Sequence, residues 1–169
     1  DSKLISMFSA VTGSVGASVG NLVAEGNKPH MMKVFWEYTT IQHTIAATLS
    51  FSLYLLVEPF VSHWLGSEYI MDHSILVLLV VYIYITNSRN SVDSFNYAHG
   101  LYADVWAAWG ELIINVSVTI VCGLEWGIIG ILLGKIASLV PIVVIWKPYY
   151  LFSTGFKESV WVYWKGVNR

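Results

Sequence analysis

Five polar or charged side chains lie within segments that are otherwise strongly apolar, and a function could use their chemistry. They are Arg89, Asp93, Glu111, Asn115 and Lys135. Lys135 stands in "GIIGILLGKIASLVP", and Glu111 stands in "WAAWGELIINVSVTI" with Asn115 one helical turn later on the same face. The two cations, Lys135 and Arg89, suit the binding of an anionic substrate, whereas carboxylates suit ion pairing or ion coupling.

Glu111 and Lys135 are expected to lie close together in a helical hairpin. Their segments are joined by the short stretch "CGLEW", with a turn predicted at residues 122–125. Counting back from this turn places Lys135 level with Asn115 and Glu111 one turn further on, within reach of a lysine at about 1.5 Å per residue. A lysine inside a bilayer costs about 2.5–3.5 kcal/mol and needs a partner or water. We expect both side chains to face the bundle interior, as a register-fixing ion pair or as part of a substrate site.

No other group of residues suggests catalysis, a metal or a cofactor. The histidines show no metal-ligand spacing, and the single cysteine, Cys122, excludes an internal disulfide and a cysteine-ligated metal site. No Ser/His/Asp or Cys/His arrangement is visible, and no glycine-rich motif has the spacing of a phosphate-binding loop. We therefore expect no enzyme activity, no metal and no cofactor.

The composition places these residues in a membrane protein. The 169-residue chain is 56% hydrophobic and 12% charged, with a mean hydropathy of +0.61, whereas soluble domains carry about 25% charged residues. The net charge of −2 gives no indication of a nucleic-acid partner. We expect an all-α integral membrane protein embedded in the lipid bilayer.

Five segments are apolar enough to be membrane spans, and each is expected to be helical because an open sheet edge in lipid leaves backbone groups unpaired. They cover residues 4–24, 39–65, 74–98, 101–121 and 126–146. The second span is expected to break at Glu58-Pro59. Residues 1–150 would form a transmembrane bundle, and residues 151–169 would form a cytoplasmic or interfacial tail.

The third span has two interpretations. Its purely apolar part is too short to cross a bilayer and continues as "TNSRNSVDSFNYAHG". In one interpretation the helix continues, with Arg89 and Asp93 on a polar stripe that lines a watery cavity. Val92 and Phe95 then lie off the stripe, on the apolar outside. In the other interpretation the helix stops at Thr86, and the remainder is a cytoplasmic loop.

The basic residues support an alternating topology. Seven of the nine lysine and arginine residues fall on alternate predicted loops, at residues 25–38, at residues 86–100 and after the fifth span, from Lys147 onwards. Lysine and arginine concentrate in the cytoplasmic loops of membrane proteins. We therefore expect these two loops and the C-terminus in the cytoplasm.

The stretch "GSVGASVG" predicts close packing between helices. Gly13, Gly16, Ala17 and Gly20 form a small-xxx-small pattern on a helix. Such a pattern lets two helix backbones approach closely in lipid, where packing rather than water holds a bundle together. Static packing and a surface on which helices slide or rock are both compatible with the pattern.

Three stretches together resemble the C-terminal half of the polysaccharide transporter, or O-antigen flippase, family of the multidrug/oligosaccharidyl-lipid/polysaccharide (MOP) exporter superfamily. "GSVGASVGNLVAEGNKPHMMKVF" resembles a small-residue helix that ends in a basic cytoplasmic loop, and "EPFVSHWLGSEYIM" resembles the outer end of the next helix. "WAAWGELIINVSVTIVCGLEWGIIGILLGKIASLV" resembles the final hairpin of the family. The order and spacing of the three stretches extend the likeness over nearly the whole chain.

The resemblance implies a bacterial inner-membrane exporter with two six-helix bundles, of which the five spans would form most of one. The chain would then be part of a longer protein whose N-terminal half is its partner, with glycan polymerase machinery as a further partner. The implied activity is the flipping of a polyprenyl-diphosphate-linked oligosaccharide by alternating access, for surface polysaccharide and lipopolysaccharide O-antigen synthesis. In such a protein Lys135 and Arg89 would meet the diphosphate.

Three alternatives stay open. A drug or metabolite exporter of the same fold, related to the multidrug and toxin extrusion (MATE) proteins, would favour a carboxylate-centred, ion-coupled pocket over a basic one. A membrane glycan polymerase or glycosyltransferase subunit would need a large extramembrane loop, which the predicted spans leave little room for. A small structural membrane subunit would be a complete chain that begins with methionine.

Overall fold

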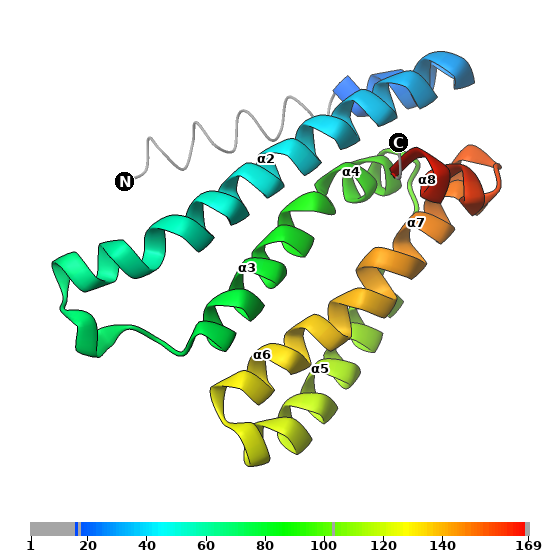
Figure 1. Ribbon diagram of the computed structural model, residues 1–169. Coiled ribbons are helices and arrows are strands. Elements are labelled where there is room, and N and C mark those ends of the chain that lie inside the picture. The colour runs from blue at the N-terminus through cyan, green and yellow to red at the C-terminus, as the bar shows by residue number, and fades with distance from the viewer. Residues whose placement is uncertain (1–15, 17, 103, 168–169) are drawn as a thin grey trace, which may run out of the picture.

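The structure of the protein is a computed structural model that describes residues 16, 18–102 and 104–167 (Figure 1). These residues contain helices and no strand. Residues 16 and 18–25 are helical. The elements that follow are α2 (Lys28–Trp64), the 3-10 turn η1 (Ser67–Tyr69), α3 (His73–Ser88), α4 (Asn90–Ala98), α5 (Asp104–Trp126), α6 (Ile128–Leu139), the π-helical η2 (Val140–Trp146), α7 (Lys147–Tyr150), the π-helical η3 (Leu151–Phe156) and α8 (Val160–Val167).

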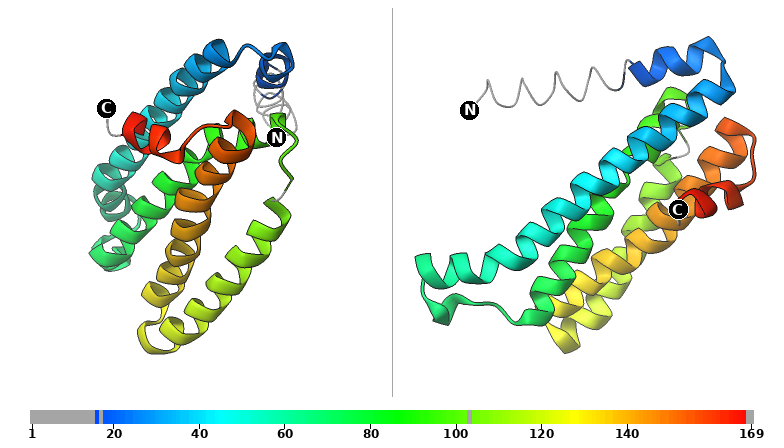
Figure 2. Two further views of the ribbon diagram at one scale, coloured as in Figure 1. Left: turned by 90° about the vertical axis from the view of Figure 1, so that its right-hand side faces the viewer. Right: turned by 45° about the horizontal axis from the view of Figure 1, so that its top comes forward.

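Four helical stretches are long and apolar enough to cross a membrane. They are Lys28–Trp64, His73–Ala98, Val105–Trp126 and Ile128–Phe156. The stretches run up and down as neighbours, with α2 beside α3 and with α6 in contact with both α3 and α5 (Figures 1 and 2). The expected all-α membrane architecture is thus confirmed for four of the five predicted spans. The first predicted span, at residues 4–24, lies largely outside the described residues.

α2 is one continuous helix of 37 residues, which corrects two predictions. Asn27 caps it, because its side-chain oxygen accepts a hydrogen bond from the backbone N–H of His30 at 3.2 Å. Pro29 lies in the first turn, where the missing N–H of proline costs no hydrogen bond. The predicted loop at residues 25–38 is therefore mostly helix. Pro59 does not break the helix either, and membrane-spanning helices tolerate proline where neighbouring groups satisfy the freed backbone carbonyl.

α3 and α4 form a nearly continuous helix, so the helical interpretation of the third span is correct and the loop interpretation is wrong. Asp72 caps its start and accepts a hydrogen bond from the N–H of Ser74 at 2.7 Å, which lowers the pKa of Asp72. Arg89 joins the two helices with near-helical dihedral angles, φ −72° and ψ −17°. The polar residues after Thr86 therefore lie on helix faces.

α5 and α6 form an antiparallel hairpin that reverses at Gly127. This residue has φ 58° and ψ −127°, a conformation that glycine adopts readily because it lacks a Cβ. The predicted turn at residues 122–125 is wrong, because α5 stays helical to Trp126. The chain reverses at Gly127, whereas Gly123, inside the predicted turn, stays within α5.

Glycine brings the two helices of this hairpin into close contact. A Cβ at Gly130 would overlap the backbone carbonyl of Cys122, and a Cβ at Gly134 would lie 2.9 Å from the backbone N of Thr119. Gly130 and Gly134 are four residues apart on α6, the spacing that permits close approach of helix backbones in lipid. Glycine therefore permits a close backbone-to-backbone contact in the α5–α6 hairpin.

The glycines predicted to pack helices do not do so within the described residues. Gly16 and Gly20 have no neighbouring atom within 4 Å of the position of a Cβ. Gly13 and Ala17 lie outside the described residues. Gly16 and Gly20 thus contact no described helix, while Gly130 and Gly134 of α6 are packed.

The last membrane-crossing stretch, Ile128–Phe156, extends past the predicted span at 126–146. Its end is held by Leu151 and Phe152, which are fully buried. The stretch ends at Lys157, whose left-handed φ of 52° allows the chain to turn towards α8. The predicted tail at residues 151–169 therefore begins one helix segment later than expected.

Aromatic rings form the core at the end of the bundle where α8 lies. Phe35 of α2 is fully buried at the centre of this core. Three rings meet it edge-on, with centroid distances of 5.2, 5.5 and 5.3 Å, from Phe95, Phe152 and Phe156. Tyr163 of α8 packs on the same cluster, and burial raises the pKa of Tyr163 to about 12. The cluster joins α2, α4, η3 and α8.

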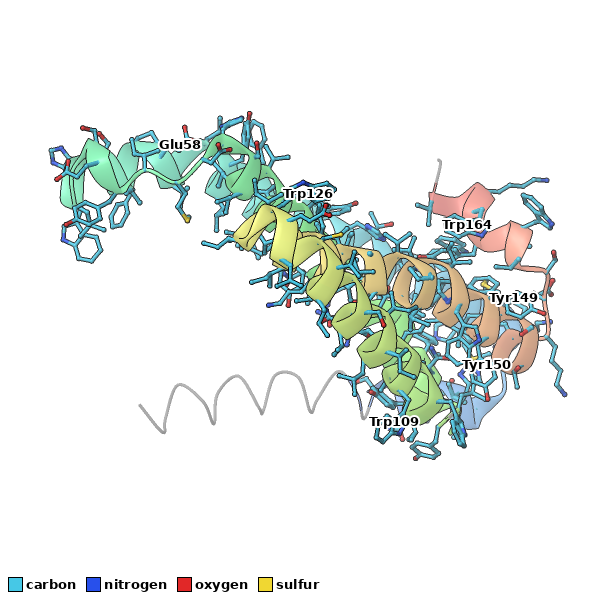
Figure 3. All side chains as sticks on the ribbon, turned by 90° about the horizontal axis from the view of Figure 1, so that it is seen from below. Glu58, Trp109, Trp126, Tyr149, Tyr150 and Trp164 are labelled. Carbon is cyan, nitrogen blue, oxygen red and sulfur yellow. The ribbon has the colours of Figure 1, made fainter. Side chains whose placement is uncertain are left out.

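Exposed tryptophans mark the two ends of α5. Trp106 and Trp109 lie near its start and Trp126 is its last residue, and all three are exposed. Trp109 and Trp126 lie at opposite ends of the bundle (Figure 3). Their spacing corresponds to about 25–30 Å of helix, close to the thickness of a hydrocarbon core. Tryptophan concentrates at both membrane interfaces, so this arrangement supports a membrane-crossing α5.

Candidate functional site

A polar cleft opens between α3, α5 and α6, with a volume of about 330 Å³. We call it the α3–α5–α6 cleft. Four of the five residues predicted to line a cavity line it: Arg89, Glu111, Asn115 and Lys135. Its wall also contains Tyr82, Thr86, Ser138 and Leu139. The volume falls within the range of about 300–1,000 Å³ that is usual for small-molecule sites.

Helical periodicity explains why these residues share one cleft. Glu111 and Asn115 are four residues apart on α5, and Lys135 and Ser138 are three apart on α6, so each pair lies on one helix face. Lys135 Nζ lies 5.3 Å from the ring centre of Tyr82 on α3, at a cation–π distance. Lys135 is an exposed residue of the cleft wall, and the aromatic ring adds a cation–π contact to its ammonium group.

The predicted ion pair between Glu111 and Lys135 does not form. Gly134 packs on Thr119, and a Cβ at Gly110 would lie 3.5 Å from Ile142 Cδ1, which together define the register of the hairpin. In this register Glu111 and Lys135 are displaced along the helices by about 10 Å, beyond direct pairing. The turn at Gly127, later than predicted, causes the difference. Both residues line the same cleft as separate charges.

Asp93, the fifth predicted residue, lies in an ion network rather than on the wall of the cleft. Its Oδ1 accepts a hydrogen bond from Lys147 Nζ at 2.7 Å, and its Oδ2 lies 3.0 Å from Arg89 Nε. The side chains of Asp93 and Lys147 are only 13% and 7% exposed. We call Arg89, Asp93 and Lys147 the Asp93 triad. Through Arg89 the triad contacts the cleft.

Lys147 is the site residue that the sequence-based topology misplaces. Its position beyond the last predicted span assigned it to a cytoplasmic tail, but it is buried in the long helical stretch. The signal in the sequence is its setting, because "VPIVVIWKPYYLF" is apolar on both sides of the lysine. A lysine flanked in this way needs a buried partner or water, as Lys135 does.

The apolar face of α4 does not lie outside the bundle as expected. Val92 and Phe95 are 3% and 0% exposed and belong to the aromatic core. Asn96 is also fully buried, and its side-chain amide has no hydrogen-bond partner among the described residues. α4 is thus enclosed on its apolar face, because α2 and η3 pack against it.

Charge is distributed unequally between the two ends of the bundle. At the end formed by the α2–α3 connection and the α5–α6 turn, the described charged residues are the carboxylates Glu58, Glu68, Asp72 and Glu125. Lys28, Lys33, Lys157 and Lys165 lie at the opposite end, where Lys28 Nζ is 2.8 Å from Glu158 Oε1. Figure 3 shows Glu58 far from Tyr149, Tyr150 and Trp164. The alternation of loops predicted from the lysines thus corresponds to two separate ends.

The fold and the cleft define an α-helical membrane protein with a charged cleft between its membrane-crossing helices. Comparison with protein-family models, with curated proteins and with solved structures gives no match for the chain.

Proposed function

We propose that the chain is part of a bacterial inner-membrane exporter that moves a polyprenyl-diphosphate-linked oligosaccharide across the bilayer. The α3–α5–α6 cleft supports this proposal most directly, because Arg89 and Lys135 lie among hydrogen-bonding groups within membrane-crossing helices. The substrate carries an anionic diphosphate between a lipid tail and a sugar. A cationic cleft beside lipid-facing helices matches that chemistry.

Each residue of the cleft has a role in this proposal. Lys135 and Arg89 bind the diphosphate, and Asn115 and Ser138 supply hydrogen bonds. Asp93 is a positioning residue, since it holds Arg89 through Nε and leaves the other guanidinium N–H groups for the substrate. Glu111 repels the anion, which keeps binding weak enough for release.

The proposed assembly and orientation follow the resemblance and the charge distribution. The helices would belong to one six-helix bundle of a two-bundle exporter of the MOP type, with an N-terminal half supplying the other bundle. The lysine-rich end, which includes the C-terminus, would face the cytoplasm. The exported oligosaccharide would pass to glycan polymerase machinery for surface polysaccharide or O-antigen synthesis.

An ion-coupled drug or metabolite exporter is a second candidate, and Glu111 favours it. This carboxylate lines the cleft without an ion pair to any described residue, as a cation-binding or proton-binding group would. Glu111→Gln distinguishes the candidates. It would abolish an ion-coupled transport cycle, whereas it would tighten binding and slow release of the lipid-linked oligosaccharide without abolishing its export.

Substitution of Lys135 tests the proposed function. In a strain that depends on the full-length protein for surface polysaccharide, Lys135→Glu should lower export about tenfold or more, because it removes one charge-assisted contact and adds a repulsive charge. Lipid extraction would measure the accumulated lipid-linked glycan, and Lys33→Ala, which removes an exposed lysine outside the cleft, serves as the control. Unchanged surface polysaccharide in the Lys135→Glu strain would refute the proposal.

A further inference from the structure

A second polar pocket lies between α2, α3 and α8, with a volume of about 500 Å³. It shares no lining residue with the α3–α5–α6 cleft. One face of α2 forms most of its wall, including Trp36, Thr39 and His43, and Tyr84 of α3 lies opposite. We call it the threonine pocket. The sequence patterns that predict the cleft do not single out any of its residues.

The threonine pocket contains buried polar atoms that the described residues leave unsatisfied. Thr39 is 3% exposed and its Oγ1 has no hydrogen-bond partner. His43 Nδ1 lies 3.1 Å from Tyr84 Oη, but His43 Nε2 is buried without a partner. Unpaired polar groups are costly in a membrane-crossing segment. Two of them on one pocket wall indicate a site for a ligand that hydrogen-bonds.

The described wall of the pocket favours an uncharged ligand. No lysine, arginine or carboxylate is among the described residues that line it. Thr40, Thr44 and Thr48 follow one another at four-residue intervals, and each hydroxyl donates to the carbonyl four residues back at 2.9, 2.8 and 2.8 Å. Their oxygen lone pairs remain able to accept hydrogen bonds. The pocket therefore suits a ligand that carries several hydroxyl groups.

Aromatic rings complete the pocket. Trp36 is stacked on Tyr163 of α8, with a centroid distance of 6.1 Å and an interplanar angle of 23°. This packing holds the indole at the end of the pocket that α8 closes. A pyranose ring has an apolar C–H face and a rim of hydroxyls. The aromatic surface can pack on the C–H face, and the hydroxyl-binding groups beside it can bind the rim.

We propose that the threonine pocket binds an uncharged sugar headgroup, either as a free sugar or as the head of a glycolipid. This inference goes beyond the proposed export function, because the pocket is separate from the cleft and contains none of its cations. Sugar binding in the threonine pocket does not require export through the α3–α5–α6 cleft, and export does not require sugar binding in the threonine pocket.

Ligand binding to the full-length protein in phosphatidylcholine nanodiscs tests the proposal. One arm titrates methyl β-D-glucopyranoside in solution, and the other includes monoglucosyldiacylglycerol in the disc. The signal is the change in tryptophan fluorescence on ligand addition that is present in the unsubstituted protein and absent from Trp36→Phe. We expect saturation in at least one arm. Thr39→Val and His43→Phe should each weaken binding by about tenfold, because each removes a hydrogen-bonding group without emptying space.

A matched control separates binding from folding. Thr119 also has a buried hydroxyl without a partner among the described residues, but it lies in the α5–α6 hairpin, so Thr119→Val should bind like the unsubstituted protein. Thr39→Val should keep or raise the melting temperature, whereas a purely structural role for the hydroxyl would lower it.

Three results would overturn the proposal: no saturable signal in either glucosyl arm, an equal signal from phosphatidylglycerol, or unchanged affinity in both pocket variants. Saturation only by the lipid assigns a glycolipid, and saturation by the soluble glucoside assigns a free sugar. Lys135→Glu should leave this binding unchanged, so a failure of the export proposal and a failure of the pocket proposal remain distinguishable.

Discussion

At the scale of single residues, the Asp93 triad links α4 to the α3–α4 junction and to the C-terminal helical stretch through ion pairs. Asp93 forms ion pairs with Lys147 of the long C-terminal stretch and with Arg89 at the junction of α3 and α4. The Asp93–Lys147 pair is almost completely buried. Removal of one partner of such a pair leaves an uncompensated charge away from water, which costs more than the pair itself contributes.

Lys147→Met should therefore lower the free energy of unfolding by about 3–5 kcal/mol, measured by thermal or denaturant unfolding in detergent. The double variant Asp93→Asn with Lys147→Met should recover part of the loss, since it removes the buried carboxylate and ammonium together but leaves Arg89 without its ionic partner. Lys28→Met is the control, because its pair with Glu158 is about half exposed and should contribute about 0–1 kcal/mol. Equal losses for Lys28→Met and Lys147→Met would show that the buried pair has no special role.

At the scale of secondary-structure elements, close packing through glycine determines the α5–α6 hairpin. Gly130 and Gly134 allow α6 to approach the backbone of α5 at Cys122 and Thr119. The register that follows places Glu111 and Lys135 in one cleft without joining them as an ion pair.

Gly130→Ala should destabilise the protein by about 1–3 kcal/mol, because the added methyl group meets a backbone carbonyl that cannot move independently. Gly20→Ala is the matched control. Its methyl group would meet no described atom, so the change should be neutral or stabilise the helix by up to about 1 kcal/mol. Unfolding in detergent measures both variants. A larger loss from Gly20→Ala would instead support packing through the N-terminal glycines.

At the scale of the whole molecule, the separation of charge between the two ends favours one orientation in the membrane. Lysines gather at the end that contains α8, and carboxylates without lysine or arginine occupy the described part of the other end. The exposed tryptophans at both ends of α5 fit the two interfaces of one bilayer.

Cysteine accessibility tests this orientation in cells. In a Cys122→Ser background, Ser67→Cys and Ser159→Cys introduce thiols at exposed positions at opposite ends of the bundle. A membrane-impermeant maleimide should label the thiol at position 67 in intact cells, and should label the thiol at position 159 only after permeabilisation. Labelling of both thiols in intact cells would contradict the alternating topology.

The sequence by itself determined the class of protein, the helical nature of the spans and four of the residues that line the cleft. These features depend on composition within a short window and on the spacing of residues along one helix. Glu111 and Asn115 share a face in any helix that contains both. A charged side chain among some twenty apolar residues faces the interior of almost any membrane bundle, because its exposure to lipid costs about 2.5–3.5 kcal/mol.

Only the tertiary structure decided which of these residues meet. The late turn at Gly127 separated Glu111 from Lys135, and burial in the extended C-terminal stretch gave Asp93 its partner Lys147. The π-helical turns of η2 add a residue to the helical repeat, so a period of 3.6 does not predict the direction of Lys147. Contacts of this kind depend on the relative positions of residues far apart in the chain, so local hydrophobicity and residue spacing do not predict them.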